Sequence, residues 1–185
     1  MASAPCVLTA GRKSQCKDSV GGIKAVYFIN FGVEPTFDAG TEEITDLQVD
    51  GAGITAYKYE LEGAGNDFVE TIQSNRDNGT TFWEQVVNLT LKKLLSATRK
   101  QLKLLAYGRP HVVVHDNNGN ALMVGLYNGC DVTGGTAVTG VALGDLSGNT
   151  LSLTGREKDP AFFLSESTLE DPFAGLVTAP TIIDE

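Results

Sequence analysis

The chain has 185 residues, of which 42% are hydrophobic, and its formal net charge at pH 7 is −9. This length suffices for one continuous hydrophobic core and is short for two ordinary domains, so we expect a single domain. No run approaches the roughly 20 apolar residues that cross a bilayer, and the first residues lack the basic and apolar regions of a secretory signal. The sequence therefore predicts neither membrane insertion nor secretion, and we expect assembly in the cytoplasm.

The three cysteines, Cys6, Cys16 and Cys130, cannot all pair within one chain. Without a secretory signal the expected environment is reducing, so we expect free thiols. Their spacing does not match that of a zinc knuckle, and we predict no metal site from them.

The charge is unevenly distributed along the chain. Residues 82–109 carry six cations and one acid, a balance of +5, whereas all other residues carry eight cations and 22 acids, a balance of −14. One interpretation is a solvated basic helix on an acidic soluble domain. The other is a molecule with electrically opposite faces, which favours head-to-tail association with copies of itself. The overall acidity disfavours strong binding of DNA.

The first half of the chain predicts a β-meander. Residues 23–32 are rich in β-branched and aromatic side chains and follow two glycines, which indicates a buried strand. Pro35 and Gly40 predict a loop over residues 34–40. In residues 54–63 the aromatic side chains alternate with charged ones, as in an amphipathic antiparallel strand. Further strands are predicted over residues 43–50 and 67–74, with turns at residues 51–53, 63–65 and 75–79.

A single long helix is predicted in the middle of the chain. Thr81 and Glu84 have the spacing of a capping box, and Gly108 followed by Pro110 supplies a stop signal. Apolar side chains between them fall within about 120° of helical arc, which is typical of a helix that lies on a sheet. This stripe consists of Trp83, Val87, Leu91, Leu94, Leu95, Leu102 and Leu105.

The second half predicts more strands. Residues 111–115 and 121–127 indicate a hairpin, in which Asn118 and Gly119 would form a type I′ turn. Strands over residues 131–143 and 150–154 follow. The expected organisation is a β domain over residues 1–164 and an irregular acidic C-terminal arm over residues 165–185. The expected fold class is mainly β with one long helix (α+β), in which two packed antiparallel sheets are flanked by that helix.

Two motifs suggest metal binding at first sight. His111 and His115 lie on a predicted strand, where they would be ~13 Å apart, so structural histidines are the favoured interpretation. Residues 116–120 resemble a calcium loop, but Ala121 stands where that loop needs glycine, and no glutamate follows at the twelfth position. The hairpin turn accounts for this segment.

No motif predicts catalysis. The sequence contains no nucleophile elbow, phosphate-binding loop or dinucleotide fingerprint, so we expect no catalytic residue, no cofactor and no metal. Tyr57, Tyr59 and Trp83 have the chemistry to stack on single-stranded bases, but their spacing fits core faces and the surrounding charge is acidic. Core packing is the favoured interpretation.

Two segments resemble structural proteins of tailed bacteriophages. The N-terminal one contains Cys6-x-Leu-Thr-x-Gly-Arg, then Cys16-Lys-Asp-Ser-Val-Gly-Gly-Ile-Lys and Val26-Tyr-Phe-x-Asn-Phe. The C-terminal one is the run GDLSGNTLSLTGREKDPA over residues 144–161. The order of elements between them is similar to that of tail tube proteins.

The resemblance implies two packed β-sheets with a helix at the side, assembled as stacked hexameric rings around a channel for DNA. It implies a place in the tail of the virion, contacts with other tail or connector proteins, passage of DNA without specific binding, and no catalytic residues. A head-to-tail connector or terminator protein is the alternative in the same class. From a different class, a small-molecule or carbohydrate-binding β-sandwich is the alternative, and an enzyme is the least favoured.

Charge suggests two surfaces for such an assembly. An acidic channel would repel passing phosphates, and residues 34–53 contain six acids and no cation. We expect these acids either on a lumen or inter-ring surface or on a solvated loop; they are Glu34, Asp38, Glu42, Glu43, Asp46 and Asp50. The basic segment offers five interface cations that would face acidic loops of a neighbouring subunit, namely Lys92, Lys93, Arg99, Lys100 and Lys103.

Overall fold

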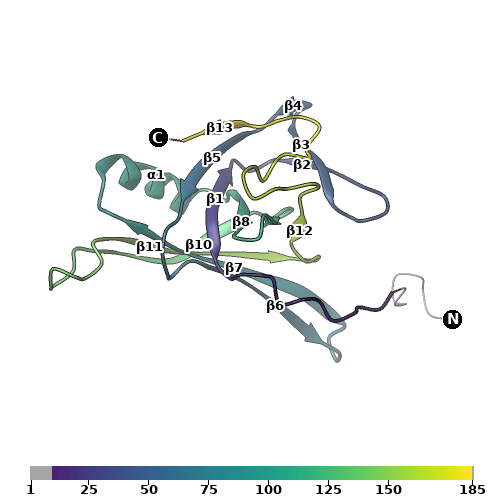
Figure 1. Cartoon of the computed structure of the whole chain (residues 1–185), viewed down its shortest axis with the longest axis horizontal. Helices are drawn as coiled ribbons and strands as arrows, with labels where there is room; N and C mark the ends of the chain where they lie inside the picture. Colours follow the sequence, from purple (N-terminus) through teal and green to yellow (C-terminus); the bar gives the residue numbers. More distant parts are fainter. Residues whose placement is uncertain (1–9, 185) are drawn as a thin grey trace.

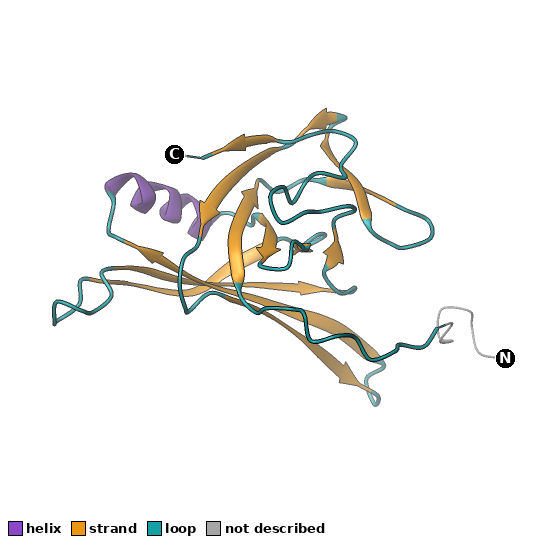
Figure 2. Ribbon diagram, in the orientation of Figure 1, coloured by secondary structure: helices purple, strands orange, loops and turns teal. Residues whose placement is uncertain are grey.

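The structure is a computed structural model that describes residues 10–184. It is mainly β with one helix, which confirms the expected fold class (Figures 1 and 2). The described strands form three sheets, where two were expected. In Figure 1 these sheets lie as three layers, with the six-stranded sheet between the other two.

The six-stranded sheet, named sheet A, has the strand order β12-β9-β8-β1-β5-β13. Its pairs are antiparallel except for β13, which runs parallel to β5. The strands are β1 (Ile23–Ile29), β5 (Thr55–Glu60), β8 (His111–Asp116), β9 (Ala121–Val124), β12 (Phe162–Phe163) and β13 (Thr181–Ile183).

Sheet A has a hydrophobic core on each of its faces. Along β1, Tyr27 and Ile29 belong to one core cluster, whereas Val26 and Phe28 belong to the other. Because successive side chains of a strand point to opposite faces, a strand that is covered on both sides is apolar almost throughout. This explains the continuous apolar run that marked residues 23–32 as a buried strand.

One face of sheet A packs on a four-stranded antiparallel sheet, named sheet C, with the order β10-β11-β7-β6. The two sheets share one core cluster. From sheet C it contains Val87 and Leu89 of β7 and Leu153 of β11, and from sheet A it contains Val26 and Val112. The strands of sheet C are β6 (Asp67–Asn75), β7 (Thr80–Lys92), β10 (Cys130–Val138) and β11 (Gly148–Glu157).

The opposite face of sheet A is covered by sheet B and by the C-terminal segment. Sheet B has the order β2-β3-β4, and Ile44 and Leu47 of β3 are fully buried in the second core. Phe173 and Leu176 bury their side chains in the same core. The strands of sheet B are β2 (Glu34–Phe37), β3 (Ile44–Val49) and β4 (Ala52–Gly53).

The predicted long helix is wrong in its first half. Residues Thr80–Lys92 form strand β7, and the helix α1 spans only Ser96–Tyr107. Leu95 takes the N-cap position without a side-chain hydrogen bond, so the predicted capping box at Thr81 does not exist. The predicted stop at Gly108 is confirmed, because its N–H bonds the carbonyl of Leu104 at 3.0 Å.

The predicted apolar stripe is divided by this change. Its first members lie on β7, where Val87 and Leu91 are buried. Leu94 and Leu95 are exposed in the connection to α1. Only Leu102 and Leu105 pack from the helix against the core, and no residue of α1 is fully buried.

Three smaller predictions also need correction. Residues 34–37, expected in a loop, form edge strand β2, where Pro35 removes no interior ladder bond because β2 lies at the edge of its sheet. The expected turn at residues 51–53 contains the short strand β4. The hairpin turn is not of type I′, because Gly119 has a positive φ of 88° whereas Asn118 has none.

The C-terminal residues 165–184 have little regular structure, but they do not form a separate arm. Besides its two core side chains, the segment contributes β13 to sheet A. In the described residues no helix is long and apolar enough to cross a membrane.

Candidate functional site

Both edges of sheet C are open in the described chain except at Cys130 of β10, whose N–H bonds the carbonyl of Pro110 at 2.8 Å. Strands β6 and β10 end the sheet, and each is nine residues long. Proteins usually protect such edges with proline, lysine, a bulge or a covering segment. Strand β10 has a bulge between Val132 and Gly134, but β6, with the sequence DFVETIQSN, has no proline, lysine or bulge. The edge of β6 is therefore a template for pairing with another strand.

Strand β6 and the start of β7 form a two-stranded ribbon that extends beyond the other layers (Figure 1). All residues from 71 to 82 are exposed, including the apolar side chains of Ile72 and Phe82. The side chain of Asn75 closes the turn by accepting the N–H groups of Asp77 and Asn78 at 3.0 and 3.1 Å. Two-stranded ribbons are at best marginally stable alone in water, so this one is suited to stabilisation by a neighbour.

The outer face of sheet C, which points away from sheet A, is rich in hydroxyl groups. Thr136 and Thr150 share a hydrogen bond of 2.7 Å across β10 and β11. Ser152 donates to the side chain of Asn88 on β7 at 2.8 Å. The Arg156 guanidinium forms an ion pair with Glu84 at 3.0 Å. These cross-strand contacts fix a polar surface that requires no apolar cover.

The structure places the predicted acidic residues on a different layer. Glu34, Asp38, Glu42 and Asp50 are exposed and Glu43 is half-buried, all on or beside sheet B. Sheet B and sheet C lie on opposite faces of sheet A. The acidic residues therefore share no surface with the open four-stranded sheet.

Asp46 does not belong to that acidic surface, because its side chain is only 5% exposed. Its carboxylate accepts hydrogen bonds from the Leu47 N–H at 3.0 Å, the Gln48 amide at 2.6 Å and the Thr178 N–H at 3.0 Å. Burial raises the pKa of this carboxyl, but the hydrogen bonds outweigh burial and the pKa is lowered overall. Asp46 is a structural residue that attaches the C-terminal segment to β3.

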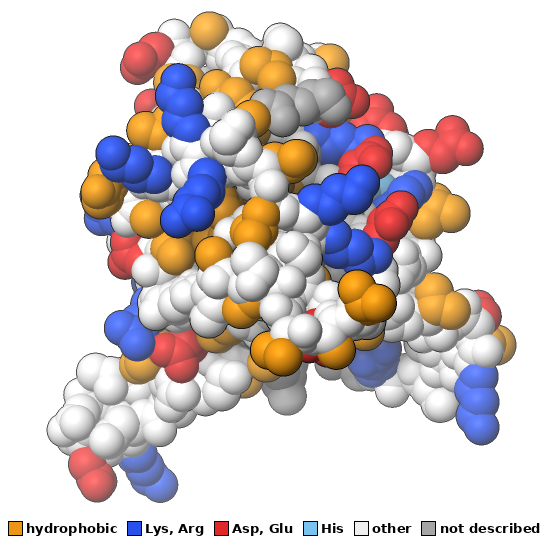
Figure 3. All heavy atoms as spheres, turned by 90° about the vertical axis from the view of Figure 1, so that its left-hand side faces the viewer, with side chains coloured by type: hydrophobic (Ala, Val, Ile, Leu, Met, Phe, Trp, Pro, Cys, Tyr) orange, Lys and Arg blue, Asp and Glu red, His pale blue; other side chains and the backbone are white. Residues whose placement is uncertain are grey.

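The predicted cations lie at the end of the molecule that carries α1. Figure 3, which views this end, shows several Lys and Arg side chains on its surface. Lys92 is the last residue of β7 and pairs with Glu62 at 3.6 Å, and Lys93 follows it with a positive φ of 66°. Arg99, Lys100 and Lys103 are exposed on α1.

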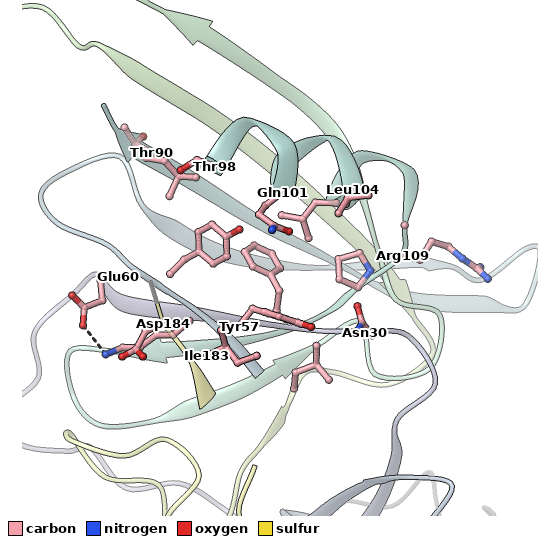
Figure 4. A pocket seen from close by; sticks show the side chains of 18 of the residues that line it. Asn30, Tyr57, Glu60, Thr90, Thr98, Gln101, Leu104, Arg109, Ile183 and Asp184 are labelled. Atoms are coloured by element: carbon pink, nitrogen blue, oxygen red, sulfur yellow. Dashed lines mark hydrogen bonds and ion pairs between the residues drawn. The ribbon is translucent and has the colours of Figure 1, made fainter. Parts of the chain in front are cut away.

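A cleft of about 960 Å³ lies between α1 and strands β1 and β5 (Figure 4). Its floor is aromatic, with the rings of Phe28 and Tyr59 in an edge-to-face contact at 5.0 Å. Its rim is polar, and Lys58 and Glu60 form an ion pair of 2.6 Å there. Tyr57, the other predicted stacking residue of this region, lines the cleft and is 37% exposed. The size suits a small molecule.

Both histidines are buried and hydrogen-bonded to the backbone. His111 Nδ1 lies 2.7 Å from the carbonyl oxygen of Gly125, and His115 Nε2 lies 2.8 Å from that of Thr168. Burial lowers the pKa of each ring, so both are neutral at pH 7. Within residues 10–184 no group of three or more His, Cys, Asp or Glu side chains is arranged to hold a metal ion.

Two buried polar side chains escaped the sequence analysis. Gln85 accepts the N–H of Gly125 at 2.9 Å and donates to Glu70 at 3.0 Å. Glu157 accepts the N–H groups of Tyr127 and Asn128 at 3.1 and 2.8 Å, and burial raises its pKa. The contacts to Gly125, Tyr127 and Asn128 fix the loop between β9 and β10, and the contact between Gln85 and Glu70 joins β7 to β6.

Of the cysteines, Cys16 is exposed and Cys130 is buried, both as free thiols. Cys6 lies outside the described residues. Trp83 is half-buried on β7.

The open sheet itself is the main feature that the sequence analysis missed. The predicted helix hid β7, and with it the continuity of four strands. The signal was present in the sequence, because the apolar Val87, Leu89 and Leu91 alternate with polar residues, which is the period of a strand.

Comparisons of the chain with protein-family models, with curated proteins and with solved structures gave no match.

Proposed function

We propose that this chain is a structural subunit of a bacteriophage tail tube or tail ring, which assembles with copies of itself into a multimeric ring around a channel. The observation that carries the proposal is sheet C, a four-stranded antiparallel sheet with edge strands of nine residues, of which β10 is bonded on its outer side only at Cys130 in the described chain. The motif resemblance described above points to the same class of protein. Closure of the edges by neighbouring copies removes the hazard of an open strand.

The strand directions fit such a ring. Three antiparallel steps separate β10 from β6, so these two edge strands run in opposite directions within one copy. Rotation about a channel axis preserves the direction of each strand along that axis. The β6 edge of one copy therefore meets the β10 edge of the next in antiparallel orientation. Each copy contributes four strands to a closed barrel without edges.

In this arrangement the outer face of sheet C lines the channel. Its hydroxyl groups are accompanied by three acids, Asp67, Glu84 and Asp131, and by two cations that are already paired, Arg156 with Glu84 and Lys92 with Glu62. Such a surface offers passing phosphates no unpaired cation on the strands, so DNA slides without specific binding. Residues 34–53, expected on a lumen or inter-ring surface or on a solvated loop, lie on the side away from the channel in this arrangement.

The arrangement applies equally to a connector or terminator ring, which is the rival within the same class.

A second candidate function, binding of a small molecule or carbohydrate, is favoured by the cleft beside α1. Its aromatic floor and polar rim have the chemistry of a sugar site. Uniform monomers that bind a saccharide would support this second candidate.

A pair of proline variants tests the edge of β6. Proline lacks the N–H that a ladder bond needs, and the N–H groups of adjacent strand residues point to opposite sides. We therefore compare Thr71→Pro with Ile72→Pro. One of them removes an N–H that bonds β7, and this variant should have a lower melting temperature. The other removes an N–H that points to the free edge of β6. We expect the variant with the wild-type melting temperature to lose assembly in light scattering.

The other variant is the internal control for damage to the fold. Normal assembly of the edge-facing variant would contradict the proposal. So would a wild-type protein that remains a 19.6 kDa species at every concentration and salt tested.

A further inference from the structure

The loop between β2 and β3 is a preorganised acidic tip. The carboxylate of Asp38 accepts the N–H groups of Gly40 and Thr41 at 2.8 and 3.0 Å, and the backbones of Asp38 and Glu43 bond at 2.9 Å. These backbone N–H donors lower the pKa of Asp38. Glu42 is exposed at a positive φ of 59°. Within residues 10–184 no cation forms an ion pair with any acid of this loop.

The end of the molecule that carries α1 has cations that, like the acids of the loop, form no ion pair in the described chain. Arg99, Lys100 and Lys103 form no ion pair within the described chain. Arg99 and Lys103 also line a hollow of about 320 Å³ between α1 and strands β10 and β11, and no acidic residue lines it.

The same hollow contains an unused hydrogen-bond donor. Asn149 lines it and is only 4% exposed, and its amide Nδ2 has no hydrogen-bond partner. Buried polar groups without a partner are rare in folded proteins. Two cations and a buried amide donor around one hollow have the chemistry to bind a carboxylate or a similar anion.

The acidic tip and the basic hollow lie at opposite ends of the molecule. In Figure 1 α1 is at the left end of the long axis and the β2–β3 loop is at the right end. The strands of sheet C run along this axis. Because strands of a closed barrel tilt from the barrel axis by only about 35–45°, both ends point along the channel toward the neighbouring rings.

We propose that the loop of residues 38–43 docks on the α1 end of a copy in the next ring, with one of its carboxylates in the hollow formed by Arg99, Lys103 and Asn149. This inference rests on the proposed ring and assigns the surface that joins one ring to the next. The occupant follows from charge complementarity, since the loop is the unpaired acidic tip at the end of the molecule opposite the hollow.

The proposed docking involves the acidic loop alone and not the whole end of the molecule on which the loop lies. Residues 10–22 lie at the same end as the loop and carry Arg12, Lys13 and Lys17 against Asp18. The docking surface is therefore limited to the loop and the hollow, and variants confined to these two places test it.

Charge reversal on both sides is the test. Arg99→Glu with Lys103→Glu reverses the hollow, and Glu42→Lys with Glu43→Lys reverses the loop. We expect each double variant to form rings of normal mass but to need about tenfold more protein, or more, to stack them at low salt. The variant with all four substitutions should stack again, because its pairs are restored with opposite sign. Asn149→Leu, which removes the buried donor, should weaken stacking while rings persist.

Lys17→Glu with Lys158→Glu is the matched control for the hollow variant, since it makes the same change of net charge at exposed positions outside both surfaces. Electron micrographs score rings and stacks separately, so failure of the ring and failure of the docking are distinguishable. Normal stacking of either double variant, or no recovery in the fourfold variant, would overturn the inference. Equal loss of stacking in the control would also overturn it, because net charge alone would then be the cause.

Discussion

His111 illustrates how backbone contacts set the state of a buried side chain. Its Nε2 accepts the N–H groups of Gly32 and Val33 at 3.1 and 3.3 Å, which requires the proton to be on Nδ1, and that proton is donated to the carbonyl of Gly125. A second proton on Nε2 would oppose two N–H donors. Burial lowers the pKa of the ring below its ordinary value of 6.5, and the Gly125 bond offsets this only in part.

Stability should therefore fall on mild acidification. A group whose pKa is depressed in the folded state contributes stability above its ordinary value, here 6.5, and loses it as the pH falls through the folded pKa. His115 acts in the same direction. We expect the free energy of unfolding in urea to be lower at pH 5 than at pH 7. His111→Gln should be less stable at pH 7 by ~1–3 kcal/mol, because buried donors lose their acceptor, and should show a smaller pH dependence.

Comparison of the variant with the wild type removes the contribution of the carboxyl groups, including Glu157, whose raised pKa acts in the opposite direction. An unchanged difference between pH 5 and pH 7 in His111→Gln would contradict this account of the ring.

The structural role of the histidines could be predicted from their position on a strand, but their partners could not. The bond from Gly32 to His111 joins residues 79 positions apart. The same limit applies to Asp46, whose bond to Thr178 spans 132 positions. Within an acidic run Asp46 has the pattern of a surface residue, and only the long-range contact shows that it is buried.

Strand β7 shows why a local pattern can predict the wrong element. Val87, Leu91 and Leu94 are spaced by four and three residues, which fits one face of a helix, yet Val87 and Leu91 also fit the period of a strand. The pairing of β7 with β11 over ten successive residues and with β6 over nine decides between the two. Such ladders join distant segments, so tertiary context overrides the local signal.

The layer that β7 occupies can be tested by truncation of its side chains. Leu89 is 2% exposed between sheets A and C, so Leu89→Ala should lower the free energy of unfolding by ~2–5 kcal/mol. Leu104→Ala, at a position 57% exposed on α1, should change it by about 0.5 kcal/mol or less. Urea titrations measure both. A loss at Leu94, which is exposed here, equal to that at Leu89 would instead support the continuous helix.

At the scale of the whole molecule, three layers give two very different outer surfaces. The core on each face of sheet A explains why sheets B and C lie on opposite sides of it. Sheet B presents the acidic loop, whereas sheet C presents open edges and a hydroxyl-rich face. The fold class and the separation of charge could be predicted from composition and pattern. The position of the open sheet could not, because it depends on β7 joining β6 to β11.

The central claim is that sheet C closes into a continuous barrel by pairing β6 of one copy with β10 of the next. Electron microscopy of the purified wild-type protein, at a resolution that separates strands, tests it most directly. The account predicts closed rings in which four strands per copy follow one another around the channel, with the Thr136 and Thr150 face inward. Monomers alone, or rings in which β6 and β10 remain unpaired, would contradict it.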